Sequence, residues 1–313
     1  MEEKALLEHI TRALYYFQVH LLFASIVGLV AWVLTSVHRG SATTKYWIWV
    51  ATTLNFLLPM GAVLDRVFAS RLAWATPLGV IGDAANSISH SPTVSTLWLV
   101  GTILMFTRLC YRMRAGRRGN HQVTSGESAL ESTRNFIADG VPVRFSTAHQ
   151  GPAVYGFLRP HISLPEGIQR LLSEHELNAV LIHELTHARR RDNLIRLIHE
   201  VGLCALWFHP LVWISGSRLA LYRELSCDES VIQRARGGDL VSALAKLAEP
   251  EQAFLLQASA SSFLMARLPR LTAVQPQPRS RTASTMLVLL FGAVLLTCVA
   301  GTVSHTACCF IHK

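Results

Sequence analysis

Long stretches without charged side chains constrain the fold of this sequence more than any other feature. Residues 14–37, 46–64 and 282–304 contain no Asp, Glu, Lys or Arg, and residues 93–111 contain only Arg108. Half of the 313 residues are hydrophobic and only 16% are charged, which is typical of membrane proteins. Because about 20 apolar residues in a helix cross a bilayer core of about 30 Å, we predict four transmembrane helices at these positions.

Clustered arginines at both ends of the polar segment, residues 112–281, indicate how the chain is oriented. The clusters consist of Arg112, Arg114, Arg117 and Arg118 at one end and of Arg267, Arg270, Arg279 and Arg281 at the other. Because basic residues stay on the cytoplasmic side, this segment is predicted to be cytoplasmic, with the loop 65–92 and the tail 305–313 outside. The topology accounts for the net charge of +9, so we expect the lipid bilayer, and no nucleic acid, as a partner.

The predicted cytoplasmic segment begins with a pattern typical of a small β-sheet followed by helices. Three short β-rich stretches, interrupted by Gly and Pro, cover residues 141–147, 153–158 and 161–164. Residues 171–189 then have helical periodicity, and Ser173 with Glu176 three residues later predicts a capping box at the start of that helix. We therefore expect an α+β domain over residues 112–281.

Residues 201–217 contain no ionised side chain and allow two interpretations. They could form a fifth transmembrane helix, but the stretch is short and His209-Pro210 interrupts it. We favour a helix hairpin that is buried or faces the membrane. Residues 268–281 are predicted to be an exposed linker, and the six cysteines, which form no C-x-x-C pair, are predicted to be small core residues.

The pattern H-E-x-x-H occurs at residues 183–187, inside the predicted helix. Side chains four residues apart lie on one face of a helix, so His183 and His187 can offer nitrogen atoms to a single zinc ion. Glu184 lies beside them, where a carboxylate can accept a proton from water. By itself, the pattern also fits a surface helix that happens to carry two histidines, so a further ligand is needed.

Glu224 is the best candidate for the third protein ligand that an open zinc site requires. It lies in a predicted helix, and Asp228 follows one turn later on the same face, where it could accept the ring N–H of a ligating histidine. An E-x-x-x-D pair alone would usually belong to a solvated helix face. Together with the upstream pair, it predicts a zinc centre formed by His183, His187 and Glu224.

Four segments of the sequence resemble the BlaR/MecR type of integral-membrane zinc metallopeptidase. They are GFLRPHISLP at residues 156–165, HELTHARRRDN at residues 183–193, WFHPLVW at residues 207–213 and ELSCDESV at residues 224–231. With three predicted spans before the domain and one after it, the resemblance covers nearly the whole chain. It implies a bacterial cytoplasmic-membrane protein in which a gluzincin-like α+β zinc metalloendopeptidase domain is inserted between the third and fourth transmembrane helices.

The resemblance also implies a role for each candidate site residue. Zinc would be bound by His183, His187 and Glu224, with Glu184 as the general base and Asp228 as the support of a ligating histidine. The β-lactam sensors of this family continue past their fourth span into a penicillin-binding domain, whereas this sequence stops at Lys313. We therefore expect no direct antibiotic sensing through such a domain.

The expected substrate is a protein, either a cytoplasmic regulator such as a transcriptional repressor or the chain itself. An extended substrate could add to the edge of residues 153–157, although that segment fits an ordinary core strand equally well. His209, Tyr222 and Arg223 are alternative candidates for stabilising the oxyanion. Regulation is expected from the loop 65–92 itself, from a membrane sensor partner docked on it, or from a homodimer. The loop fits a plain connector equally well, with control by substrate availability.

Two other functions fit parts of the same pattern. An HtpX-like membrane quality-control protease shares H-E-x-x-H, a later Glu and membrane spans, but the W-F-H-P and R-R-D segments favour the BlaR/MecR type. A non-proteolytic membrane signal transducer with a structural zinc needs no general base. The presence of Glu184 therefore argues against a purely structural site.

Overall fold

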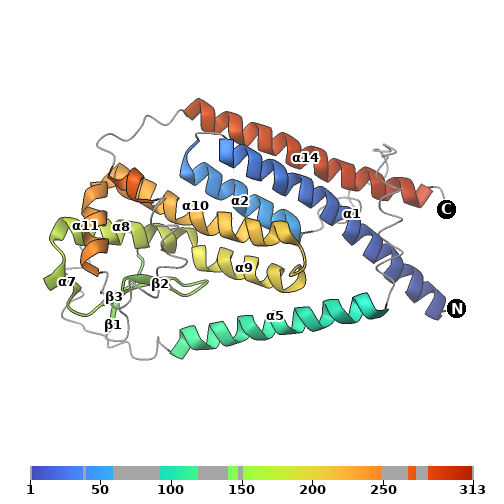
Figure 1. The fold of residues 1–313 in the computed structure, drawn as a ribbon, viewed down its shortest axis with the longest axis horizontal. Helices are drawn as coiled ribbons and strands as arrows, with labels where there is room; N and C mark the ends of the chain where they lie inside the picture. Colours follow the sequence, from blue (N-terminus) through green and yellow to red (C-terminus); the bar gives the residue numbers. More distant parts are fainter. Residues whose placement is uncertain are drawn as a thin grey trace.

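The computed structural model of the chain describes residues 2–37, 40–58, 92–118, 140–146, 151–247, 267–272 and 281–311. The described part is mostly helical (Figure 1). The helices are α1 (Glu2–Val37), α2 (Ala42–Leu57), α5 (Pro92–Arg118), α7 (Ile168–Leu171), α8 (Glu174–Arg190), α9 (Asp192–Ala205), α10 (Pro210–Arg234), α11 (Gly237–Leu247) and α14 (Arg281–Ile311). The strands are β1 (Val143–Ser146), β2 (Ala153–Tyr155) and β3 (His161–Pro165).

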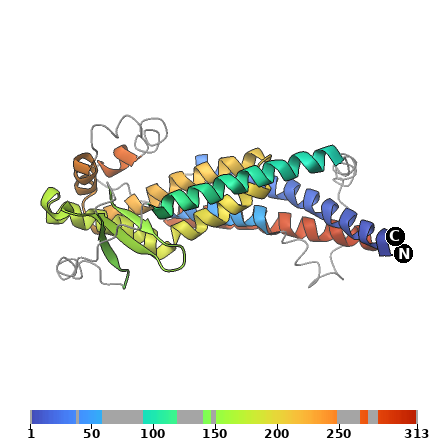
Figure 2. The same ribbon diagram turned by 90° about the horizontal axis from the view of Figure 1, so that it is seen from below.

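The long helices lie in layers along the length of the molecule, from α14 through α1, α2, α10 and α9 to α5 (Figure 1, Figure 2). The strands lie with α7, α8 and α11 at one end of this stack. The beginning of α1 and the end of α14 lie at the opposite end. The molecule therefore has an apolar helical end and a smaller α+β end.

Helices occupy the described part of every predicted transmembrane stretch. Phe17–Val37 in α1 and Thr93–Arg114 in α5 are long and apolar enough to cross a membrane. Within the described residues, the 16-residue α2 and the segment Ser284–Cys298 of α14 are apolar but shorter. Helix formation is thus confirmed where the chain is described, whereas four membrane crossings remain a prediction. The predicted outside loop 65–92 lies outside the described residues except for Pro92.

α5 exposes apolar side chains along its length, which is unlike a helix on the surface of a soluble domain. The exposed side chains include Val94, Leu97, Leu99, Ile103, Leu104 and Phe106. α5 packs on α9, and the indole Nε1 of Trp98 donates to the carbonyl of Ala205 at 2.9 Å. A hydrocarbon environment would suit this surface, in agreement with the predicted third span.

One hydrophobic core joins α1, α2 and α14 to α10, the helix that carries Glu224. Tyr46 and Trp49 of α2 are almost completely buried in it, next to Leu219 and Leu225 of α10. Burial of one large apolar side chain stabilises a fold by about 1.5–3 kcal/mol. α2 is therefore held firmly against a helix that supplies part of the candidate site.

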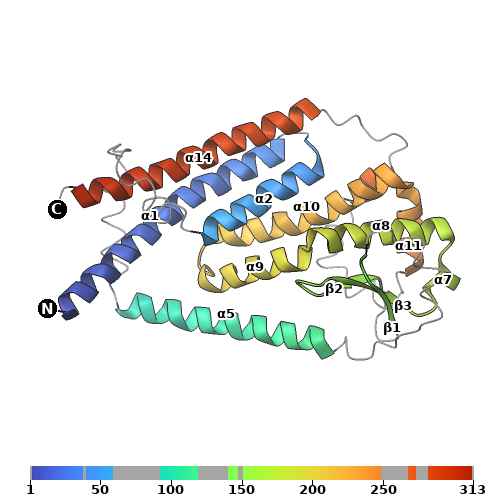
Figure 3. The same ribbon diagram turned by 180° about the vertical axis from the view of Figure 1, so that it is seen from behind.

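The predicted small sheet is present at the α+β end of the molecule (Figure 3). Its strand order is β1-β3-β2, with β1 parallel and β2 antiparallel to β3. Ile162 and Leu164 of β3 are fully buried in a second core, together with Val180 and Leu181 of α8. Within the described residues, β2 is thus an edge strand that lies beside the helix carrying the histidine pair.

α8 begins with the predicted capping box and ends at a left-handed residue. The Ser173 hydroxyl accepts from the Glu176 N–H, and the Glu176 carboxylate accepts from the Ser173 N–H, which satisfies the first amides of the helix. At the other end, Arg191 adopts φ 54°, a conformation that breaks the helix and lets α9 begin at Asp192. This sharp turn brings Asp192 back toward His187.

Residues 201–217 form the predicted helix hairpin. α9 ends at Ala205 and α10 starts at Pro210, a residue that favours the first turn of a helix. The predicted linker 268–281 requires a correction at its start. Residues 267–271 are helical and Leu271 is 3% exposed within the second core, so burial of this side chain fixes the segment to the domain.

Candidate metal centre

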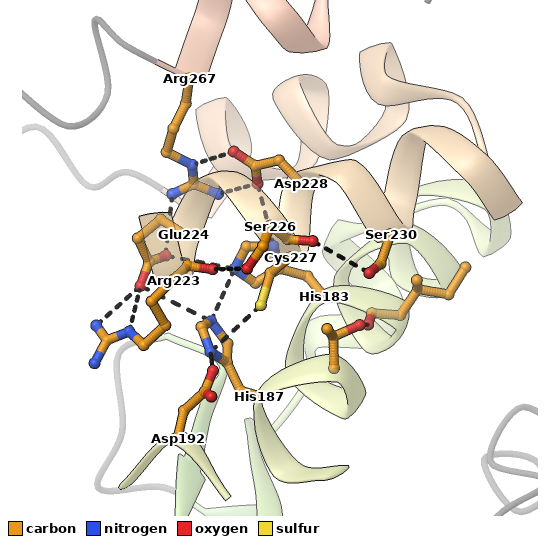
Figure 4. Close-up of polar contacts among 12 residues, drawn as sticks. His183, His187, Asp192, Arg223, Glu224, Ser226, Cys227, Asp228, Ser230 and Arg267 are labelled. Atoms are coloured by element: carbon orange, nitrogen blue, oxygen red, sulfur yellow. Dashed lines mark hydrogen bonds and ion pairs between the residues drawn. The ribbon is translucent and has the colours of Figure 1, made fainter. Parts of the chain in front are cut away.

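His183 and His187 point toward each other from one face of α8 (Figure 4). Their Nε2 atoms are 3.3 Å apart. Two nitrogen ligands at about 2.0–2.1 Å from a tetrahedral zinc ion would be separated by about 3.3–3.4 Å. The spacing of the two rings therefore fits a shared metal ion.

Glu224 of α10 completes the predicted group of three ligands. Its Oε2 lies 3.6 Å from His183 Nε2, and its Oε1 lies 3.9 Å from His187 Nε2. Glu224 lies 41 positions after His183 and 37 positions after His187 in the sequence. The three side chains nevertheless converge because α10 packs against α8. Two imidazoles and one carboxylate form the donor set of an open zinc site.

Cys227 is a second candidate for the third ligand. Its sulfur, with one nitrogen of His183 and one of His187, forms a group whose donor atoms all lie within 4.8 Å of one another. Burial raises the pKa of the Cys227 thiol well above its ordinary value, although the Arg190 guanidinium opposes this effect. Its sulfur lies 3.4 Å from His187 Nδ1, the nitrogen that contacts Asp192, and accepts from Arg190 at 2.9 Å, so it lies on the Asp192 side of the ring.

Glu224 has the opposite electrostatic character. Burial opposes its ionisation, but the hydrogen bond with His183 and the charges of His187 and Arg223 hold the pKa of this carboxyl well below its usual range. The Arg223 guanidinium donates to Glu224 Oε1 at 2.9 Å. Glu224 is therefore an ionised oxygen donor, and the chemistry of the donor set favours it over Cys227.

Asp228 lies behind His183, as the sequence predicted. Its Oδ1 is 3.2 Å from His183 Nδ1, and Arg267 donates to its two carboxylate oxygens at 2.8 Å each. Burial alone would lower the pKa of His183, but the bonds to Asp228 and Glu224 raise it to about 9. A metal ion that binds His183 at neutral pH must therefore displace a proton from this ring.

Asp192 plays the corresponding part behind His187. Its Oδ2 lies 2.7 Å from His187 Nδ1 and accepts from Arg190 at 2.7 Å, while its Oδ1 accepts from the Tyr46 hydroxyl at 2.6 Å. Burial opposes ionisation of Asp192, but the bond to His187 and the charge of Arg190 lower its pKa. Because an ionised carboxylate only accepts hydrogen bonds, His187 carries its proton on Nδ1 and presents Nε2 to the metal position.

The histidine pair opens into a cavity of about 370 Å³ that Glu184, Arg223 and Glu224 also line. Glu184 is half-buried there, next in sequence to a ligand candidate, as the pattern predicted. Of the three oxyanion candidates, only Arg223 lines this cavity. Tyr222 instead donates to the Thr35 carbonyl at 3.1 Å, and His209 lies at the tip of the helix hairpin against α1 and α2.

Sequence reasoning did not assign the contacts of Asp192, Tyr46, Arg267 or Cys227. Asp192 could have been suspected, because it is an acid placed directly after the end of the histidine helix. Arg267 was interpreted as a topology-determining charge, whereas its side chain is 13% exposed and pairs with Asp228. This contact adds a second role to the predicted one, since burial of the Asp228 carboxylate demands a cationic partner.

Comparison with known proteins places the chain in a family. Residues 16–239 match the family described as BlaR1 peptidase M56. The chain is 27% identical over 248 residues to the regulatory protein BlaR1 of Bacillus licheniformis, a match that covers 74% of this chain and 41% of that protein. It is 24% identical over 146 residues to the methicillin resistance mecR1 protein of Staphylococcus aureus, covering 44% of this chain and 24% of that protein.

The same identity and coverage hold for the mecR1 protein of Staphylococcus epidermidis. The chain thus spans less than half the length of these curated relatives. The family match, by contrast, covers more than half of this chain and includes α8, α9 and α10, which carry the histidine pair and Glu224. On this evidence, the chain belongs to the BlaR1 peptidase M56 family.

Proposed function

We propose that this protein is a membrane-embedded zinc metalloendopeptidase that performs regulatory proteolysis. One observation carries the proposal: His183 Nε2, His187 Nε2 and the Glu224 carboxylate converge beside a cavity that Glu184 also lines. A structural zinc site is closed by four protein ligands, whereas a catalytic site leaves a position for water and substrate. The cavity supplies that position, which favours a peptidase over a signal transducer with a structural zinc.

The proposed roles follow from the donor atoms. His183, His187 and Glu224 would hold zinc, which when bound supplies Lewis acidity toward a carbonyl oxygen and toward water. Glu184 accepts a proton from the attacking water and passes it to the leaving nitrogen of the cleaved peptide bond. Asp228 and Asp192 keep the two imidazoles oriented so that both Nε2 atoms face the cavity.

An extended peptide along β2 is the substrate geometry that the site supports. β2 borders the metal-site cavity through Ala153 and Val154, and it borders a second cavity of about 550 Å³ through Val154 and Tyr155, with Gly156 following. A substrate that adds as a strand to this edge would therefore pass from one cavity into the other. Asn193 already donates to the Val154 carbonyl at 2.8 Å, which leaves fewer backbone acceptors for the substrate.

The proposed setting is the bacterial cytoplasmic membrane, with the α+β end in the cytoplasm. The long apolar helices and the exposed apolar surface of α5 support membrane insertion. One relative is named as a regulatory protein, which supports a cytoplasmic regulator, or the chain itself, as the substrate. A second copy or a membrane sensor would then control when cleavage occurs.

Zinc-dependent cleavage by the purified full-length protein tests the proposal. Protein in detergent micelles is incubated with a library of unstructured peptides, with zinc and after removal of zinc by a chelator. We expect cleavage that requires zinc and returns when zinc is restored. Stoichiometric zinc binding without cleavage of any peptide, in detergent and in lipid vesicles, would support the structural-zinc transducer instead.

A further inference from the structure

Tyr46 connects an apolar helix of the bundle directly to the metal centre. It lies near the start of α2, and its side chain is fully buried. Its hydroxyl donates to Asp192 Oδ1 at 2.6 Å, and the Arg190 guanidinium stacks over its ring at 4.4 Å. The hydroxyl therefore makes a charge-assisted hydrogen bond, which is stronger than one between neutral groups.

The other oxygen of the same carboxylate holds His187. Asp192 Oδ2 lies 2.7 Å from His187 Nδ1, and His187 Nε2 faces His183 and Glu224. An unbroken series of contacts thus leads from α2 to the nitrogen that would bind the metal. If the Tyr46 hydroxyl moves or is lost, Asp192 keeps only its bonds to Arg190 and His187, and its carboxylate can rotate.

Further contacts fix the start of α2 against the peptidase helices. The N–H and hydroxyl of Thr43 donate to Glu229 Oε2 of α10 at 2.9 and 2.8 Å. Lys45 Nζ donates to the Thr35 carbonyl at 2.7 Å, and Tyr222 donates to the same oxygen at 3.1 Å. The position of the Tyr46 hydroxyl is therefore set by how α2 packs on α10.

We propose that Tyr46 is a positioning residue of the metal centre, which makes zinc affinity depend on the placement of α2. The proposal rests on the proposed zinc-peptidase function. Tyr46 does not touch the metal position and acts through Asp192 on His187. A displacement of α2 within the bundle then changes the support that His187 receives through Asp192.

The variant Tyr46→Phe removes the hydroxyl and keeps the ring. We expect its zinc affinity, measured on the full-length protein by competition with a chromogenic chelator, to fall about tenfold, the lower end of the range for partners of metal-binding histidines. Co²⁺-substituted protein should show shifted visible absorption bands, which report ligand geometry. Thr52→Val is the matched control, because it removes a buried hydroxyl of α2 that donates to the Ile48 carbonyl of the same helix, and it should keep wild-type affinity within about twofold.

A double-mutant cycle with Asp192→Asn shows whether Tyr46 acts through Asp192. If it does, the double variant should lose no more zinc affinity than Asp192→Asn alone, because the route is already broken. Equal affinities of wild type and Tyr46→Phe, or additive losses in the double variant, would overturn the proposal. A lower melting temperature of Tyr46→Phe with unchanged affinity would overturn it as well, since the hydroxyl would then be only structural.

These measurements distinguish a failure of the positioning role of Tyr46 from a failure of the proposed zinc-peptidase function. If wild type binds zinc and cleaves peptide while Tyr46→Phe matches it in both, only the positioning role fails. If wild type and His183→Ala bind zinc equally, the metal centre itself is wrong. Zinc binding and cleavage are measured on the same preparations, so each outcome identifies which of the two proposals is at fault.

Discussion

The two histidines of the candidate metal centre are supported in different ways. We call Asp228 with Arg267 the His183 support, and Asp192 with Tyr46 and Arg190 the His187 support. The two residues of the His183 support lie on α10 and on the short helical segment at residues 267–271. The His187 support reaches across to α2, one of the apolar helices of the bundle.

The two supporting carboxylates are held by different sets of partners. Arg267 holds Asp228 by two parallel hydrogen bonds, an arrangement that fixes the carboxylate plane. Asp192 instead accepts hydrogen bonds from two donors on different helices, Tyr46 of α2 and Arg190 of α8. α2 is an apolar helix of the bundle that packs against α10. The support of His183 thus comes from α10 and residues 267–271, whereas the proposed route through Tyr46 links His187 to α2.

The largest expected effect comes from Glu184, which belongs to neither support. Glu184→Gln should reduce peptide cleavage by about 10²–10⁴-fold, because the attacking water loses its proton acceptor. Zinc content should stay at the wild-type level, since both supports and all three proposed ligands are intact. Cleavage assays and metal analysis on one preparation measure both quantities, and undiminished turnover would remove Glu184 from its role.

The next effect separates the two candidates for the third ligand. Glu224→Ala should lower zinc affinity by more than about 100-fold, beyond the range expected for residues that only support a ligand. Cys227→Ala should change it by less than about threefold, because its sulfur lies beside His187 Nδ1, the nitrogen that faces Asp192 and not the metal position. Competition with a chelator measures the zinc affinity of both variants. A larger loss of affinity in Cys227→Ala than in Glu224→Ala would assign the metal to Cys227.

Arg267 tests the His183 support. Arg267→Met should destabilise the protein by about 3 kcal/mol, because it leaves the buried Asp228 carboxylate without its cation, and zinc affinity should fall about tenfold. Arg270→Met is the control, since this arginine is exposed on the same helical segment. Chemical unfolding and chelator competition measure the effects. If the two variants behaved alike, Arg267 would have no part in the support of His183.

The smallest effect on the metal is expected from Glu176, at the other end of α8. Bonds from Lys246, Ser242 and Ser173 lower the pKa of Glu176 to about 2, from an ordinary value of 4.5. The lowered pKa stabilises the folded state above pH 4.5, and this contribution is lost as the pH falls from 4.5 to 2.

Glu176→Gln should therefore be less stable than wild type at pH 6, and the difference should shrink as the pH approaches 3. Zinc affinity at pH 7 should stay unchanged, because Glu176 contacts neither support. Thermal unfolding across this pH range measures the trend, with the exposed Glu174→Gln as a control. A difference between wild type and Glu176→Gln that grows toward low pH would contradict the assignment.

The features that the sequence predicted well depend on residues close together in the chain. Ser173 and Glu176 form the expected capping box, and the three strands overlap the stretches predicted from alternation at 141–147 and from β-rich composition at 153–158 and 161–164. The histidine pair shares a helix face because a helix repeats every 3.6 residues. The same periodicity placed Asp228 one turn after Glu224, and Asp228 does lie against His183. The crossing of the membrane by four helices remains a prediction from composition and length.

The tertiary structure alone decided which distant side chains complete the site. Tyr46 and Asp192 are 146 residues apart, and Arg267 and Asp228 are 39 residues apart. Contacts at such separations leave no periodic pattern in a single sequence. They arise because α2 packs on α10 and because residues 267–271 pack onto the second core. Local geometry therefore placed the two histidines on one helix face, whereas long-range packing brought Glu224 to them and selected the groups that support His187 and the cation that pairs with Asp228.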